Sequence, residues 1–162
     1  MNNVYIFGFN LFFTRTQKIK IFSSINNIVS LLKIENYLLD ISFVCDCDIK
    51  KLNKKFRNKN LSTDVLTFCA NNSEEIFAFK NILGEIVISI DKANKQAYEF
   101  NHTLEEEVIA LIVHGLCHLL GIDHEVSKEE CNFQIQYEMM LLNCANISPK
   151  IALCGRILNV CI

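Results

Sequence analysis

The order in which extended and helical patterns follow one another constrains the fold of this chain more than any other feature of its sequence. Short runs rich in β-branched and aromatic residues indicate strands, and longer stretches with apolar residues at helical spacing indicate helices. Strands are expected at residues 4–9, 39–45, 64–69 and 82–90, helices at residues 15–33, 48–58, 91–100, 103–120 and 127–143, and a loop or hairpin turn at residues 71–80. This order predicts an α+β fold with a small mixed sheet of about four strands packed against helices.

Capping boxes are expected at Thr103 with Glu106 and at Ser127 with Glu130, and Asp48 and Asp91 are the candidate caps of the helices that they begin. In the helix 15–33, the apolar face at helical spacing is formed by Phe22, Ile25, Val29 and Leu32.

The length of the chain, 162 residues, fits a single domain. Hydrophobic residues make up 51% of it and charged residues 21%, and this balance excludes a disordered chain. No internal repeat, low-complexity segment or Pro/Gly/Ser-rich linker divides the sequence. We therefore expect one domain over residues 1–145, followed by a tail at residues 146–162 whose packing the sequence does not predict.

The N-terminal residues carry no pattern for export or for a membrane. They have no basic segment before the apolar run and no small-residue cleavage site, and no apolar run approaches the ~18–20 residues of a membrane span. A cytoplasmic location is therefore expected. In that reducing compartment the eight cysteines are expected to be small buried hydrophobic side chains and not a disulfide framework.

Three of the four histidines lie within eleven residues, at His114, His118 and His124. His114 and His118 are four positions apart on the expected helix 103–120, so their side chains lie on the same face. Gly121 follows the last helical turn, where a residue in the left-handed conformation is common. A chain that reverses there can bring His124 to the same ion.

Three neutral imidazoles suit Zn²⁺, and a site with three protein ligands keeps a fourth position open, as catalytic zinc sites do. The sequence therefore predicts one catalytic zinc ion per chain, at the end of a central helix. Near the ligands, Cys117 is expected to pack in the core and His102 to lie at the surface or in a loop. Asp123 has two open interpretations: it orients an imidazole, or it caps the turn.

Similar histidine spacing occurs in metalloproteases with the pattern H-E-x-x-H-x-x-G-x-x-H. Their glutamate is the general base of peptide hydrolysis. Gly115 occupies that position here, and glycine cannot accept a proton. A zinc metalloprotease is therefore the weaker interpretation of the histidine pattern.

Residues 50–59 hold a concentration of positive charge. They contain six of the sixteen basic residues and no acidic residue, although the whole chain has a formal net charge of −2. The six are Lys50, Lys51, Lys54, Lys55, Arg57 and Lys59. Such a patch is typical of a surface that binds phosphates, although a solvated helix face has the same composition. Phe56 lies within it and is expected to pack in the core, with base stacking as the alternative.

Four segments resemble the YbeY family of rRNA maturation factors, which are single-strand-specific metallo-endoribonucleases. Residues 114–124 resemble its histidine signature, residues 52–59 its L-N-x-x-[YF]-R-x-K segment, residues 62–68 its P-T-D-V-L-S-F strand and residues 84–89 its G-D-I-x-I-S strand. The differences from these patterns are Ser62 for proline, Thr67 for serine and Glu85 for aspartate. The resemblance extends from about residue 52 to residue 140.

The resemblance implies zinc bound by His114, His118 and His124, with Arg57 as the other functional residue. It also implies single-stranded RNA as substrate, maturation of the 3′ end of the small-subunit rRNA, ribosomal subunits as partners and a part in ribosome quality control. Asp64 and Glu85 are expected to line the same cleft. A non-catalytic ribosome-assembly factor with a structural metal is the main alternative.

Overall fold

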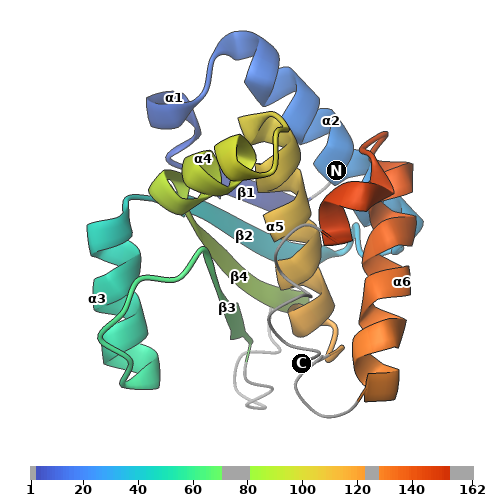
Figure 1. Ribbon diagram of the computed structural model, residues 1–162. Coiled ribbons are helices and arrows are strands. Elements are labelled where there is room, and N and C mark those ends of the chain that lie inside the picture. The colour runs from blue at the N-terminus through green and yellow to red at the C-terminus, as the bar shows by residue number, and fades with distance from the viewer. Residues whose placement is uncertain (1–2, 71–80, 123–127, 154–162) are drawn as a thin grey trace.

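In the computed structural model of the chain, helix α5 (Leu104–Leu119) packs against a four-stranded sheet (Figure 1). It describes residues 3–70, 81–122 and 128–153. The strands are β1 (Asn3–Phe7), β2 (Tyr37–Val44), β3 (Val65–Cys69) and β4 (Asn81–Ser89). The other helices are α1 (Phe9–Phe12), α2 (Arg15–Leu31), α3 (Asp46–Arg57), α4 (Ile90–Glu99), α6 (Lys128–Cys144) and a 3₁₀ helix, η2 (Pro149–Leu153). The predicted α+β class with a four-stranded sheet is confirmed.

The sheet has the strand order β1-β2-β4-β3. The pairs β1–β2 and β2–β4 are parallel and the pair β3–β4 is antiparallel, so the sheet is mixed as predicted. β3 is therefore the edge strand next to β4. The loop or hairpin turn expected at residues 71–80 lies outside the described residues.

Alternate residues of the strands enter two apolar clusters, because successive side chains of a strand point to opposite faces. The larger cluster joins the sheet to α2, α5 and α6 through Leu39, Ile41, Phe43, Ile86 and Ile88. On the opposite face, Leu66 and Val87 contact Ile49 of α3. The sheet thus separates α5 from α3, which lies at its β3 side in Figure 1.

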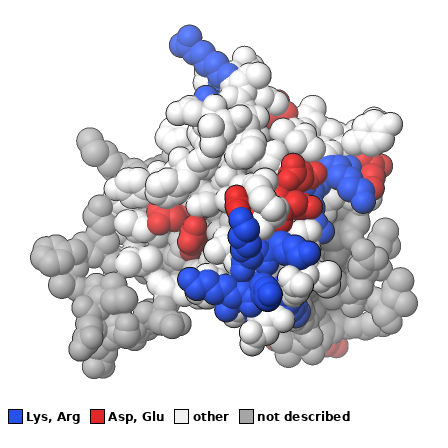
Figure 2. Space-filling model, turned by 90° about the vertical axis from the view of Figure 1, so that its left-hand side faces the viewer, with Lys and Arg blue, Asp and Glu red and all other residues white. Residues whose placement is uncertain are grey.

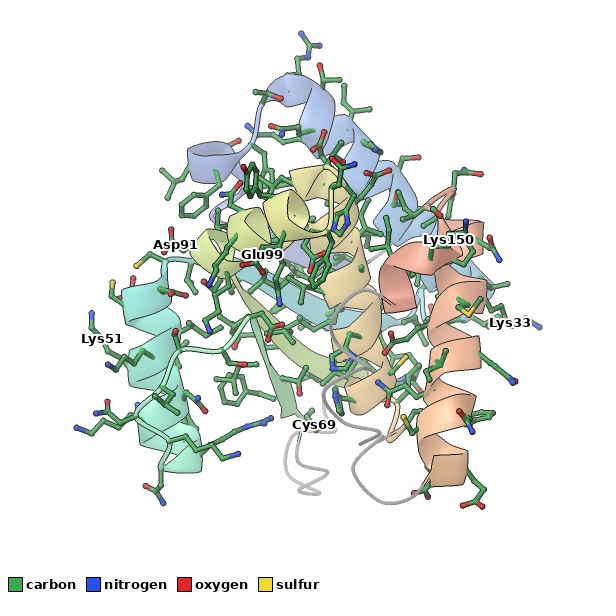
Figure 3. All side chains as sticks on the ribbon, viewed as in Figure 1. Lys33, Lys51, Cys69, Asp91, Glu99 and Lys150 are labelled. Carbon is green, nitrogen blue, oxygen red and sulfur yellow. The ribbon has the colours of Figure 1, made fainter. Side chains whose placement is uncertain are left out.

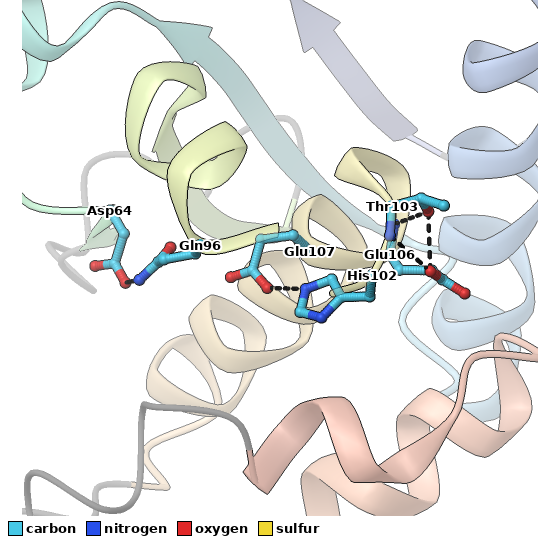
Figure 4. Close-up of polar contacts among 6 residues, drawn as sticks. All are labelled: Asp64, Gln96, His102, Thr103, Glu106 and Glu107. Carbon is cyan, nitrogen blue, oxygen red and sulfur yellow. Dashed lines mark hydrogen bonds and ion pairs between the residues drawn. The ribbon is translucent and has the colours of Figure 1, made fainter. Parts of the chain in front are cut away.

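Helix α5 begins at the capping box that the sequence predicts. Thr103 Oγ1 accepts a hydrogen bond from the backbone N–H of Glu106 at 3.3 Å, and Glu106 Oε2 accepts one from the backbone N–H of Thr103 at 2.9 Å (Figure 4). Ten of its 16 residues are buried. Despite this apolar character, none of the helices in the described part of the chain has the combination of length and hydropathy needed to cross a membrane.

The predicted caps of α3 and α4 are wrong. We expected Asp48 and Asp91, whereas Cys45 precedes α3 and Ser89 precedes α4. Ser89 Oγ accepts a hydrogen bond from the backbone N–H of Lys92 at 3.2 Å. Each helix starts where the preceding strand ends, so strand pairing sets the helix start. The predicted cap of α6, Ser127, lies outside the described residues.

The buried face of α2 differs from the predicted one by one position. Phe22 was expected in the core, but its side chain is 48% exposed. Ile21, Ile25, Ile28 and Val29 are the apolar side chains that α2 buries. The spacing of apolar residues in the sequence fits either of two overlapping faces of the helix. The packing of α2 on α5 and α6 buries the face formed by isoleucine and valine side chains.

The imidazole of His102 is buried, and of the two expected positions, at the surface or in a loop, only the loop is confirmed. Its side chain is 7% exposed and its Nε2 lies 2.6 Å from Oε2 of Glu107, which is 2% exposed (Figure 4). The prediction that His102 lies in a loop is correct, but the loop folds its ring inward. Glu107 stands on the buried side of α5, where a carboxylate requires a polar partner.

The cysteines do not share one environment. Cys117 is buried in the core as expected, whereas Cys47 and Cys69 are exposed. Cys131 is disulfide-bonded. The expectation of buried reduced thiols is therefore wrong for these last three residues.

Replacing His102 should destabilise the fold. In His102→Ala the buried carboxylate of Glu107 loses its imidazole partner, so we expect the free energy of unfolding to fall by about 3 kcal/mol. Urea denaturation followed by circular dichroism measures this change. Thr103→Ala, which removes only the cap of α5, is the control and should cost about 1 kcal/mol. Equal losses of unfolding free energy in the two variants would show that the buried His102–Glu107 pair stabilises the fold no more than a helix cap does.

Candidate active site

Two imidazoles converge near the C-terminal end of α5. His114 and His118 stand on one face of the helix, with their Nε2 atoms 3.1 Å apart and their ring centroids 4.7 Å apart at an interplanar angle of 80°. Two nitrogens that bind one tetrahedral zinc ion at 2.0–2.1 Å lie about 3.3 Å from each other. The pair is therefore spaced as two ligands of a single ion would be.

Helix α6 supplies a carboxylate behind His114. Nδ1 of His114 lies 2.8 Å from Oε1 of Glu138, and the two side chains are 13% and 4% exposed. Because an ionised carboxylate only accepts hydrogen bonds, this contact places the proton of His114 on Nδ1 and leaves a lone pair on Nε2. Gln134 Nε2 donates a hydrogen bond to the same Glu138 oxygen at 2.8 Å. Carboxylates in this position orient and strengthen histidine ligands.

Sequence reasoning did not find Glu138 or Gln134. Their spacing places both on one side of α6, four positions apart, and both are buried. Two polar residues on the buried side of a helix are a signal for a polar site. Which residue they face is decided by the packing of α6 against α5.

The chain turns sharply after α5, as the sequence predicts. Gly121 has φ 79°, in the left-handed region where glycine has no steric penalty. The backbone N–H of Gly121 donates to the carbonyl of His118, and that of Ile122 donates to the carbonyl of Cys117. These two bonds end the helix in a Schellman motif. His124 and Asp123, which follow the turn, lie outside the described residues.

Gly115 lies on the side of α5 that packs against the sheet. A Cβ atom at this position would lie 2.9 Å from Cγ2 of Ile86 on β4. The glycine therefore lets the helix approach the strand, and a glutamate would be pushed into the core. Cys117 is fully buried and burial raises the pKa of its thiol, so the prediction that it packs in the core is confirmed.

Edge strand β3 connects the histidine pair to Arg57. Nη2 of Arg57, in the last turn of α3, donates a hydrogen bond to the carbonyl of Thr67 at 3.3 Å. Two residues further along, Sγ of Cys69 lies 3.9 Å from the carbonyl of His118 (Figure 3). Two residues of a strand span about 7 Å. The guanidinium of Arg57 and the backbone at the C-terminal end of α5 thus contact one short segment of β3.

Asp64 and Glu85 have partners away from the histidine pair. Oδ2 of Asp64 accepts a hydrogen bond from Nε2 of Gln96 on α4 at 2.9 Å (Figure 4). Oε1 of Glu85 accepts one from Oγ of Ser42 on β2 at 2.9 Å. Glu85 alternates with Ile86, so it points to the α3 face of the sheet. The expectation that both carboxylates line the cleft of the histidine pair stays a prediction.

Figure 2 shows Lys and Arg side chains gathered on the face formed by α3. We call this the basic surface, and it comprises Lys50, Lys51, Lys54, Lys55, Arg57 and Lys59, all of them exposed. Phe56 stands among them with 55% of its surface exposed, so the expectation of core packing for its ring is wrong. Lys51 pairs with Asp48 at 2.8 Å, and this hydrogen bond raises the pKa of Lys51.

A second group with metal-ligand chemistry lies at the start of α3. In the described part of the chain, Cys45, Cys47 and Asp48 form the one cluster of three such side chains whose ligand atoms all lie within 4.8 Å. Both Cys47 and Asp48 are exposed. The hydrogen bond with Cys45, burial and the charge of Asp48 raise the pKa of the Cys47 thiol. The thiol of Cys47 therefore favours the protonated form, which is the poorer ligand.

Comparison with known proteins places these features in a family. The family model described as Endoribonuclease YbeY matches residues 12–144. A protein named Endoribonuclease YbeY from Aquifex aeolicus is 49% identical over 102 residues, which cover 63% of this chain and 66% of that protein. One of the same name from Caldicellulosiruptor bescii is 40% identical over 134 residues, which cover 74% and 80%.

A solved structure gives the same result for the fold. The solution structure of a protein from Thermotoga maritima superposes with a TM-score of 0.54 at 29% identity, covering 86% of this chain and 89% of the other. The family match covers β2, β3 and β4, the helices from α2 to α6 and the histidine stretch. The chain belongs to the YbeY family of endoribonucleases.

Proposed function

We propose that this chain is a zinc-dependent endoribonuclease that cleaves single-stranded RNA. His114, His118 and His124 hold one Zn²⁺, and Arg57 is the catalytic residue that contacts the phosphate. The observation that carries the proposal is the convergence of two Nε2 atoms at 3.1 Å, with the carboxylate of Glu138 on the far nitrogen of one ring. Imidazole nitrogens arranged in this way are characteristic of zinc sites.

The protein side chains prepare the site for a cation. Glu138 holds the proton of His114 on Nδ1, so the ring presents a lone pair in a fixed direction, and Gln134 steadies the carboxylate. A bound zinc ion supplies Lewis-acid polarisation of the scissile phosphodiester. The turn at Gly121 supports the assignment of His124, because it ends the helix in a left-handed conformation directly after the histidine pair.

Arg57 binds and orients the phosphate. Its guanidinium has five N–H donors in a planar fork, and the contact with Thr67 uses one Nη2 group. A fork of this shape pairs with two phosphate oxygens and stabilises the negative charge that develops during cleavage. The hydrogen bond to the carbonyl of Thr67 keeps the guanidinium beside β3, and Cys69 of the same strand contacts the carbonyl of His118.

The substrate that we propose is ribosomal RNA, at the 3′ end of the small-subunit rRNA, with ribosomal subunits as partners and a cytoplasmic role in ribosome quality control. The basic surface supports an RNA substrate because it concentrates positive charge on a chain of net charge −2. A protease is not supported, since Gly115 packs against Ile86 and leaves no room for the glutamate base. A non-catalytic assembly factor is the competing outcome of the experiments below.

Loss of the metal ligands should abolish cleavage. The purified protein should contain about one zinc per chain by plasma emission spectrometry, and His114→Ala should reduce this content and the cleavage of single-stranded rRNA fragments together. Removal of zinc by a chelator should have the same effect, and re-addition should restore cleavage. Identical cleavage by wild type and His114→Ala would point to a contaminating nuclease and favour the assembly factor.

Substitutions of Arg57 should distinguish the contribution of its positive charge from that of its planar, forked guanidinium. We expect Arg57→Ala to lower kcat by about 10²–10³-fold, the usual cost of removing a donor that stabilises a developing charge. Arg57→Lys keeps the charge but loses the fork, so kcat should recover only in part while the RNA affinity recovers almost fully. Zinc content should remain that of wild type in both variants. Full activity of Arg57→Lys would contradict a bidentate role.

Glu138 should tune the metal affinity. In Glu138→Gln the residue keeps its shape but loses its charge, so we expect zinc affinity to fall by about 10–100-fold. Competition with a fluorescent chelator measures this affinity without reference to activity. Glu129→Gln, an exposed substitution on the same helix, is the matched control and should leave the affinity unchanged. An equal affinity in both variants would rule out a supporting role for Glu138.

A further inference from the structure

The aromatic ring of Phe56 has no place in the catalytic arrangement described above, and its exposure calls for an explanation. α3 buries Ile49 and Asn53, whereas Phe56 is 55% exposed in the last turn of the same helix. Burial of a phenylalanine side chain ordinarily contributes to the stability of a fold. This position forgoes part of that contribution in the middle of the basic surface.

We propose that Phe56 is a stacking platform for an unpaired nucleobase of the RNA. The inference rests on the proposed function and deepens it, because it names a residue that distinguishes single-stranded from duplex RNA. A base in a duplex is already stacked on its neighbours and does not offer its face to a side chain. A base in a single strand can turn out of its stack and lie on an aromatic ring.

The ring of Phe56 is held in one orientation and is reachable from solvent. It packs against Phe68 of β3 in an edge-to-face arrangement with centroids 5.0 Å apart and an interplanar angle of 71°. Nζ of Lys55 lies 4.9 Å from the ring centroid, so a charged group from the surface already reaches the ring. Lys55 is exposed, and its ammonium can move to a phosphate when a base takes its place on the ring.

The charges around the ring suit a nucleotide and not an apolar partner. Lys54, Lys55, Arg57 and Lys59 are all exposed within three residues of Phe56. Proteins that bind single strands without sequence preference combine a positive surface for the phosphates with aromatic rings for the bases. Since Phe68 and Thr67 are neighbours on β3, a base on Phe56 leaves its own phosphates close to the guanidinium of Arg57.

Phe133 on α6 provides a matched control for this proposal. Its ring is 56% exposed, nearly the same fraction as for Phe56. Glu129 and Glu130 lie one helical turn before it, so its surroundings are acidic where those of Phe56 are basic. Exposure alone therefore predicts equal behaviour of the two rings, whereas the proposal predicts that only Phe56 contacts RNA bases.

The absence of tryptophan from the chain permits a direct test. Phe56→Trp and Phe133→Trp each introduce a single fluorophore into the full-length zinc-loaded protein. The probes are a short single-stranded 2′-O-methyl phosphorothioate oligoadenylate that resists cleavage, the same backbone without bases, and a duplex RNA of equal length. We expect the oligoadenylate to quench the indole fluorescence of Phe56→Trp by base stacking and to leave that of Phe133→Trp unchanged. Neither the abasic strand nor the duplex should quench either variant.

Affinity gives a second readout that does not depend on the fluorophore. Phe56→Leu should bind the single-stranded oligoadenylate about 5- to 150-fold more weakly than wild type and should bind the duplex equally well. Equal quenching in the two tryptophan variants, or unchanged affinity of Phe56→Leu for the oligoadenylate, would refute the proposal that Phe56 stacks on an RNA base. If wild type still cleaves RNA in that case, the proposed function stands. If wild type neither binds nor cleaves RNA, both proposals fail.

Discussion

The close packing of α5 on β4 is the constraint on which the rest of the structure depends. Gly115 lets the helix approach Ile86, and this contact assigns one side of α5 to the sheet. His114, the preceding residue, points about 100° around the helix from Gly115 and contacts Glu138 of α6, and His118 stands one turn further along beside it. The capping box at Thr103 and the left-handed turn at Gly121 fix where the helix begins and ends. Core packing and the candidate metal site therefore depend on the same helix.

The sheet places the two chemical features of the molecule on either side of its edge strand. The histidine pair belongs to the α5 side, and the basic surface belongs to α3 on the other side. β3 contacts both, through Thr67 to Arg57 and through Cys69 to the carbonyl of His118. An RNA strand that crosses this edge would meet Phe56, Arg57 and the histidine pair in turn. The short antiparallel strand thus sets the separation between Arg57 and the C-terminal end of α5.

Local sequence signals predicted the elements well where they are set by local contacts. The capping box of α5 and the glycine turn after it involve residues at most five apart, so short-range geometry is sufficient. Predictions failed where an element's surroundings decide the outcome. Phe22 and Phe56 have the spacing of core residues but are exposed, because the neighbouring helices and the sheet cover other positions. His102 lies in a loop, which was one of the two positions expected for it, but its ring is buried against Glu107 of α5 and not at the surface.

The sequence by itself determined the order of strands and helices, the placement of His114 and His118 on one helix face, and the concentration of basic charge in residues 50–59. These follow from periodicity and spacing, which are properties of adjacent residues. Only the tertiary structure decided that Glu138 and Gln134 stand behind His114, that β3 lies between Arg57 and the histidines, and that Phe56 is exposed. Each of these joins residues from separate elements, and their distances are fixed only when the core packs.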